Sequence, residues 1–310
     1  MGVKQSIFSS NGEKRGFRSI EHTWGESYRV VPQFPMSALF TPDPSWKKGD
    51  TSNLFFKTSF DYVLATDEGR PLIAIDFDGM GAGFDRLGKY VQVEATPDRN
   101  RRAKFDFKLS YAQRNEFPYH IVASEEFEHL GEDVELTLVD SLIGATIARL
   151  SFNERLPSLK LEHADILDNL RPSQQSEYIQ DLVISLEIEC ESEHNPIVQK
   201  TATVLQQIAE ITGSFHPCSE WSYSYFEIPE APYYDFFSYD VEQFRRRVEA
   251  LERADWQGCV VTLRDTPVGD VSEVVQVRNL GCGEIILSDV AELMAWSKLL
   301  RLLRRRHGQD

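Results

Sequence analysis

The chain has 310 residues and a formal net charge of −16, because 49 acidic side chains outnumber 33 basic ones. This length suits two domains, and a hydrophobic content of 41% is enough to build ordinary cores. No apolar run reaches the ~18 to 20 residues that a membrane span needs, and the N-terminal residues lack the apolar core of a signal peptide. We therefore expect no membrane partner.

The acidic charge is concentrated in the second half of the chain. Residues 1–123 hold 17 basic and 15 acidic side chains, whereas residues 124–310 hold 16 basic and 34 acidic ones. Because the second half would repel a polyanion, a nucleic-acid surface is expected only in the first half. The four cysteines show no C-x-x-C spacing and are interpreted as the reduced thiols of a cytoplasmic protein.

The first half predicts a layered α/β arrangement. Residues 1–19 are polar and are expected to be poorly ordered. Two apolar runs around a turn at 67–69 predict a β-hairpin, and a stripe of apolar residues predicts a helix before a third strand. In chain order, the predicted elements are a helix over 20–28, an extended segment over 29–35, a loop over 41–53, strands over 54–65 and 72–77, a glycine-rich loop over 79–88, a helix from 99 or 101 to 115, and a strand over 119–123.

The second half predicts an α+β region of its own, so the expected domains are residues 1–150 and 151–310. Polar composition over 151–176 predicts a linker or insertion, and the alternation V-I-S-L-E-I-E predicts a strand over 181–189. The other predicted elements are helices over 124–130, 136–150, 196–212 and 241–253, an irregular aromatic tract over 217–239, a hairpin of strands over 259–264 and 271–278, and a last helix capped by Ser288.

Three carboxylates lie on the predicted hairpin of the first half. Asp61 is on its first strand, and Asp76 and Asp78 end the second strand in the run I-A-I-D-F-D-G. Residues i and i+2 of a strand face the same side, so Asp76 and Asp78 are expected to project together. Facing carboxylates repel each other unless a cation lies between them, and Mg²⁺ or Mn²⁺ prefers such oxygen ligands. The sequence therefore predicts a metal site formed by Asp61, Asp76 and Asp78.

A lysine on the following helix completes this pattern. Lys108 is expected either to stabilise the charge that develops on a phosphate held by the metal or to orient the attacking water. Each residue also has an ordinary structural interpretation, because aspartates before a glycine are common turn residues and helical lysines are usually solvated. Arg101, Arg102 and Lys104 at the start of the same helix are predicted to contact phosphates of the substrate, although an exposed helix start also accounts for them.

The stretch resembles the PD-(D/E)XK, or restriction-endonuclease-like, nuclease superfamily. Within it, the chain is most similar to a bacterial group of very-short-patch-repair-like domains with a D…E-x-D-G…K pattern. The resemblance covers roughly residues 17–148 and depends mainly on F-D-Y-V-L, P-L-I-A-I-D-F-D-G and K-L-S-Y-A-Q-R-N-E-F-P-Y-H-I-V. It implies a central mixed β-sheet flanked by helices and metal-dependent phosphodiester cleavage.

The resemblance also implies a role for each site residue. Asp61 matches the metal-binding aspartate, Asp76 stands where the pattern usually has glutamate, and Asp78 takes the third position. Lys108 matches the lysine that lies on the helix, and Glu21 matches an acid of the N-terminal helix. The shortened acid at Asp76 and the absence of a histidine usual after the D-G pair are departures from the family pattern.

These observations leave three hypotheses. The first is a Mg²⁺-dependent nuclease that acts through its N-terminal half on DNA, with RNA as the second substrate to consider. The second is a catalytically inactive protein of the same fold that serves as a nucleic-acid-binding or protein-interaction module, which the two departures favour. The third is an interaction component whose acidic C-terminal half binds a basic protein partner, mimics nucleic acid or binds a second copy of the chain.

Overall fold

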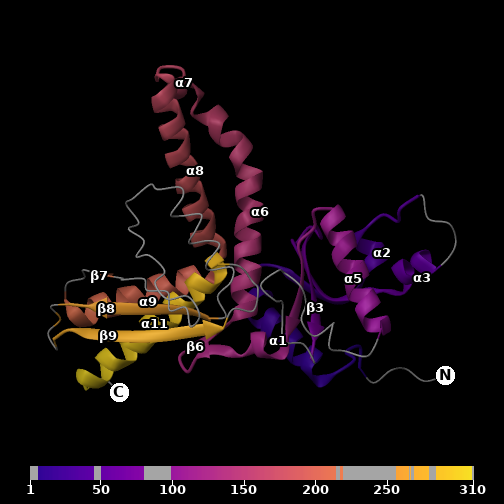
Figure 1. Ribbon diagram of the computed structural model, residues 1–310, viewed down its shortest axis with the longest axis horizontal. Coiled ribbons are helices and arrows are strands. Elements are labelled where there is room, and N and C mark those ends of the chain that lie inside the picture. The colour runs from indigo at the N-terminus through magenta and orange to yellow at the C-terminus, as the bar shows by residue number, and fades with distance from the viewer. Residues whose placement is uncertain are drawn as a thin grey trace. The chain divides into compact units, whose positions relative to one another are not determined.

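The chain forms two compact units, Met1–Glu128 and His129–Asp310, in a mixed α/β structure. The computed structural model in Figure 1 describes residues 6–44, 50–79, 99–213, 217–218, 256–264, 266, 269–278 and 284–308. The division falls after Glu128, whereas the sequence predicted it near residue 150. Within these described residues, no helix has the length and apolar character needed to cross a membrane.

A mixed four-stranded sheet forms the centre of the N-terminal unit. Its strands are β1 (Arg29–Pro35), β2 (Ser59–Ala65), β3 (Pro71–Asp78) and β4 (Tyr119–Ala123), in the order β1-β2-β3-β4. β1, β2 and β3 are antiparallel, whereas β3 and β4 are parallel. The parallel pair follows from the helix α5 (Arg99–Arg114), which lies between these two strands in the sequence. The predicted order of strand, strand, helix and strand is confirmed.

Helices lie on both faces of this sheet. On β3, Asp76 contacts Lys108 of α5, whereas the next residue, Phe77, approaches Gly12 of the helix α1 (Asn11–Trp24). A Cβ atom at Gly12 would lie 2.7 Å from the Phe77 ring, so a larger residue there would require the ring to move. On the α5 face, a mainly aromatic cluster that includes Phe60 and Tyr119 forms the core.

Several predictions for the N-terminal unit are wrong. The helix predicted over 20–28 ends at Trp24, and of the helix predicted over 124–130 only a 3₁₀ turn over 124–127 is present. The polar leader is helical from Asn11, and the Ser10 side chain caps this helix by accepting a hydrogen bond from the Glu13 amide at 3.1 Å. Residues 54–57 belong to the helix α3 (Asp50–Lys57) and not to a strand, because Phe55 packs into the aromatic cluster from one side of that helix. The remaining short elements are α2 (Met36–Leu39) and the 3₁₀ turn η1 (Ser124–Phe127).

The C-terminal unit packs the helix α11 (Glu284–Arg306) against a hairpin. Buried Leu293, Trp296 and Leu299 of α11 share one core with Val261 and Val275 of that hairpin. The described elements of the unit are the strands β5 (His129–Gly131), β6 (Val134–Thr137), β7 (Pro217–Cys218), β8 (Trp256–Leu263) and β9 (Val271–Arg278), and the helices α6 (Leu138–Glu162), α7 (Ala164–Leu167), α8 (Pro172–His194), α9 (Pro196–Thr212) and α11. The sheet order β7-β8-β9 contains the predicted hairpin as β8 and β9.

A long antiparallel pair of helices replaces the predicted linker and strand of this unit. Residues 151–176 continue α6, form α7 and begin α8, and residues 181–189 lie within α8. The apolar residues Ile179, Leu182, Leu186 and Cys190 are spaced at helical intervals, and Leu186 and Cys190 are buried against α6. The alternation of apolar and polar residues over 181–189 therefore indicated the two-residue period of a strand, whereas the segment is helical.

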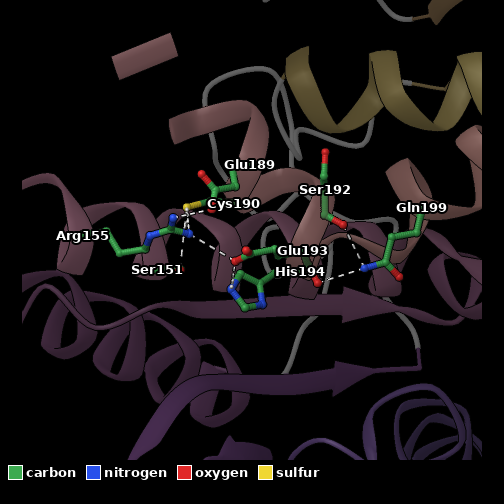
Figure 2. A network of polar contacts seen from close by, with 8 residues as sticks. All are labelled: Ser151, Arg155, Glu189, Cys190, Ser192, Glu193, His194 and Gln199. Carbon is green, nitrogen blue, oxygen red and sulfur yellow. Dashed lines mark hydrogen bonds and ion pairs between the residues drawn. The ribbon is translucent and has the colours of Figure 1, made fainter. Parts of the chain in front are cut away.

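Charged residues join the two helices near the base of this pair. Figure 2 shows Arg155 of α6 between Glu189 and Glu193 of α8, at 2.5 and 3.2 Å. The Arg155 guanidinium also donates to the Cys190 thiol at 3.7 Å. These contacts link α6 to α8, but their exposed positions limit their contribution to stability. The last helix begins at Glu284, before the predicted cap at Ser288.

Several predictions lie outside the described residues. These are most of the glycine-rich loop over 79–88, residues 45–49 of the loop over 41–53, most of the aromatic tract over 217–239, and the helix over 241–253.

Candidate functional site

Asp61 and Asp76 meet where the backbone ladder between β2 and β3 ends. The last paired residues of that ladder are Tyr62 and Ile75. Beyond them, the Asp61 amide donates to Asp76 Oδ1 at 3.0 Å, and the Phe77 amide donates to Asp61 Oδ2 at 2.8 Å. Each aspartate side chain thus replaces a backbone acceptor of the neighbouring strand. This exchange holds two carboxylates together at the point where the strands separate.

Lys108 and Tyr119 bind the second oxygen of Asp76. The Lys108 ammonium forms an ion pair with Asp76 Oδ2, and the Tyr119 hydroxyl donates to the same oxygen at 2.6 Å. The Asp76 and Lys108 side chains are 1% and 8% exposed, so water screens their attraction poorly. The Lys108 ammonium also lies 5.2 Å from the centre of the Phe60 ring, within cation–π range. The structure therefore brings together Asp61, Asp76 and Lys108, as the sequence predicted.

The environment of Asp61 favours its protonated form. Burial and the adjoining Asp76 carboxylate raise the pKa of Asp61 to about 7, although Lys108 and the Phe77 amide act to lower it. Glu13 adds a smaller effect that also raises this pKa. A carboxyl group that titrates near neutral pH holds a proton more readily than an ordinary surface aspartate, and a cation must displace that proton to bind.

Asp78 lies two residues after Asp76 on β3 and has a different partner. It is 1% exposed and forms an ion pair with Arg101 of α5. Arg101 was predicted to contact substrate phosphate, and its guanidinium also lies 5.7 Å from the centre of the Phe105 ring. Asp78 is thus held by a protein cation beside the Asp61–Asp76 pair.

Two residues that the sequence analysis missed extend the site toward α1 and β1. The Gln33 side-chain amide donates to Asp61 Oδ1 at 3.1 Å and to Glu13 Oε1 at 2.5 Å, and the Ser59 hydroxyl donates to the Gln33 carbonyl oxygen at 3.3 Å. The Glu13 side chain is buried and also accepts from the Ser9 amide at 2.8 Å. Glu13 follows Ser10 by three residues, the spacing of a helix capping signal, and this signal could have indicated α1.

Gln33 has an unusual backbone conformation for its position in a strand. Its φ of 54° lies in the left-handed region, which costs a non-glycine residue of the order of 1 kcal/mol. The neighbouring register pairs Pro32 with Tyr62 and Phe34 with Phe60, so the irregularity is local to Gln33 and Asp61. Backbone strain of this kind is common at functional sites, where the surrounding structure maintains it.

The other predicted site residues are exposed. Glu21 lies on the exposed side of α1, whose buried residues are Glu13, Gly16, Ile20 and Trp24, so the acid of this helix that contacts the site is Glu13. Lys104 is exposed on α5. Arg102 is exposed as well and pairs with Asp106 one turn later at 3.7 Å. Lys104 and Arg102 are thus accessible to a phosphate, as the prediction requires.

The donor atoms fit a hard cation in type. Asp61 and Asp76 supply carboxylate oxygens, which Mg²⁺ and Mn²⁺ prefer. All four of these oxygens accept a bond from the protein, and in the described part of the chain no group of three or more His, Cys, Asp or Glu side chains is placed to hold a metal. A cation here would share two carboxylates with Lys108, and Asp78 would join only by leaving Arg101.

Comparison of the chain with the models of known protein families, with curated proteins and with solved structures finds no match. The function of the chain is therefore inferred from the geometry of the site.

Proposed function

We propose that the N-terminal unit is a divalent-cation-dependent nuclease with a restriction-endonuclease-like fold, acting on DNA rather than RNA. The observation that carries this proposal is the pair of the half-buried Asp61 and the buried Asp76 beside the Lys108 ammonium. Two adjoining carboxylates with little exposure to water are costly to maintain, and such pairs are common at functional sites. The mixed sheet with helices on both faces is consistent with the fold that the sequence resembles.

Each residue has a defined role in this proposal. Asp61 and Asp76 would hold Mg²⁺ or Mn²⁺, which supplies polarisation of a phosphoryl oxygen and acidification of a bound water. Asp61 must release its proton to bind the cation, so cation binding strengthens as the pH rises through about 7. Lys108 would place its positive charge near the phosphate where negative charge develops. Arg102 and Lys104, both exposed on α5, would bind the backbone phosphates of the substrate.

The test is cleavage of supercoiled and linear DNA, with RNA alongside, in Mg²⁺, in Mn²⁺ and in EDTA. We expect Asp61→Asn and Lys108→Met to lower the rate by about 100-fold or more, as the loss of a preorganised charged group usually does. Glu13→Gln should lower the rate less, because Glu13 reaches the site through Gln33. Glu21→Gln, an exposed change on the same helix, is the matched control. Equal rates in Asp61→Asn and wild type would refute the assignment.

A second candidate is a catalytically inactive protein that keeps the fold as a binding module. The observation that favours it is the neutralisation of both carboxylates of β3 by protein cations, Asp76 by Lys108 and Asp78 by Arg101. Calorimetric titration with Mn²⁺ at pH 8 separates the two candidates, because an inactive site of this kind should bind no cation. Heat of binding that disappears in Asp61→Asn would favour the nuclease.

A further inference from the structure

The helical pair of the C-terminal unit carries an apolar surface that the described residues leave uncovered. We name residues 149–189 the arm; it comprises the second half of α6, α7 and most of α8 (Figure 1). Among the arm side chains that the structure describes, only Leu186 is buried. Leu161 and Ile188, in contrast, are 78% and 61% exposed, and Ile166 and Ile184 are also exposed. A pair of helices cannot bury apolar residues that lie on more than one side of each helix, so a further element can cover the exposed apolar residues of the arm.

A groove between the two helices offers such a place, although the four exposed side chains named above do not line it. Its volume is about 480 Å³, and Leu159 of α6 with Leu182 and Leu186 of α8 are the apolar residues that line it. Ser158 and Ser185 add small polar groups to its walls. An apolar floor along a pair of helices is the usual setting for an amphipathic helix, which inserts residues spaced three and four apart.

The charges around the groove are mostly negative. Glu154, Glu162 and Glu189 line it together with Arg155. The Arg155 guanidinium is already paired with Glu189 and with Glu193. The whole of α8 contains six acidic residues and no lysine or arginine. An incoming segment therefore meets an acidic surface whose one lining arginine is neutralised within the arm.

We propose that the groove of the arm is a docking site for a basic amphipathic helix of a partner protein. Apolar side chains on one face of that helix would contact Leu159, Leu182 and Leu186, and its lysines or arginines would lie against Glu154 and Glu162. A second copy of the chain fits less well, because its own α8 carries the same charge and no lysine or arginine, and most leucines of its basic α11 are buried in the core. A nucleic acid is disfavoured by the same carboxylates.

The test measures binding of a labelled synthetic peptide to the full chain by fluorescence anisotropy. The peptide is a helix of about 20 residues, long enough to span the groove, with leucines on one face and lysines on the rest. One matched peptide has the same composition with the leucine positions shuffled, and another has glutamate in place of lysine. We expect only the first peptide to bind with a dissociation constant below about 1 mM.

Variants of the chain then locate the binding. Glu154→Lys and Glu162→Lys should each weaken binding by about tenfold or more, whereas Glu210→Lys, an equal charge change on the exposed side of α9, should not. Leu182→Ser tests the apolar floor without a change of charge, and circular dichroism checks that it remains folded. Absence of binding, equal binding of the shuffled peptide, or equal loss in Glu210→Lys overturns the proposal. So does a dimer in sedimentation that Ile188→Ser dissociates, because a second copy would then cover the arm.

Discussion

Changing Asp61 to asparagine should alter how the stability of the N-terminal unit depends on pH. The folded protein raises the pKa of Asp61 from 3.8 to about 7, mainly through burial and through the Asp76 carboxylate. As the pH rises above 3.8, the unfolded chain loses this proton first, and the folded chain holds it until about pH 7. The unfolded state thus binds fewer protons, so the free energy of unfolding falls as the pH rises through this window.

The size of the effect follows from this pKa. Each pH unit within the window lowers the free energy of unfolding by at most about 1.4 kcal/mol. Because Asp61 is only half-buried, we reduce this value and expect a fall of about 2 kcal/mol between pH 5 and pH 7. Asparagine removes this fall. It also keeps only one acceptor oxygen for the Gln33 and Phe77 amides, which costs about 1 to 2 kcal/mol at every pH. The variant should therefore be less stable than wild type at low pH, and the difference should narrow toward pH 8.

Urea unfolding in EDTA at pH 5, 6, 7 and 8 measures this difference, with a separate transition fitted for each unit. Other titrating groups are common to both proteins and cancel. Asp67→Asn is the control, because Asp67 is 79% exposed in the turn between β2 and β3, and its pH profile should match wild type. Parallel profiles for wild type and Asp61→Asn would refute the reasoning. Added Mg²⁺ should flatten the pH profile of the wild type but not that of Asp61→Asn. If it does not, Asp61 binds no cation, whereas the conclusion that Asp61 titrates near pH 7 still stands.

Two further substitutions test packing, one within each unit. Lys108→Met leaves the buried Asp76 carboxylate without its cation and should lower the free energy of unfolding by about 3 to 5 kcal/mol. The exposed Lys104→Met should change it little, and similar losses for both variants in urea unfolding would contradict the buried ion pair. Gly144→Ala would place a Cβ atom 2.9 Å from the backbone that leads into α9 and should lower the free energy of unfolding by about 1 to 3 kcal/mol in thermal unfolding. Gly131→Ala is the control, because the nearest atom to its added Cβ lies at 3.7 Å.

Local signals in the sequence were sufficient for several elements. The hairpin of β2 and β3 follows from two apolar runs around Gly69, whose φ of 87° suits a tight turn. The helix α9 has the predicted bounds, because Asn195 caps its start before a proline and Gly213 ends it with a φ of 72°. In these cases the turn or cap residues lie within a few positions of the element that they define, so no distant contact was needed.

The errors concern segments whose structure depends on distant partners. Residues 181–189 alternate like a strand, but their helix is stabilised by contacts of Leu186 and Cys190 with α6, which is far away in the sequence. The acid of the N-terminal helix that contacts the site is Glu13, and Glu21 is exposed, because a bridge through Gln33 selects which helical residue meets Asp61. The spacing of residues in the sequence does not predict the bridge that Gln33 forms between Glu13 and Asp61.

The sequence by itself determined that Asp61, Asp76 and Lys108 lie on neighbouring elements of one layered unit, because strand alternation and helix period are local properties of the chain. Only the tertiary structure decided which atoms meet. The β2–β3 ladder ends at Tyr62 and Ile75, so the two aspartates exchange hydrogen bonds with opposite strands, and α5 places one ammonium against one carboxylate. Those contacts depend on strand separation and burial, which arise only when elements far apart in the sequence pack together.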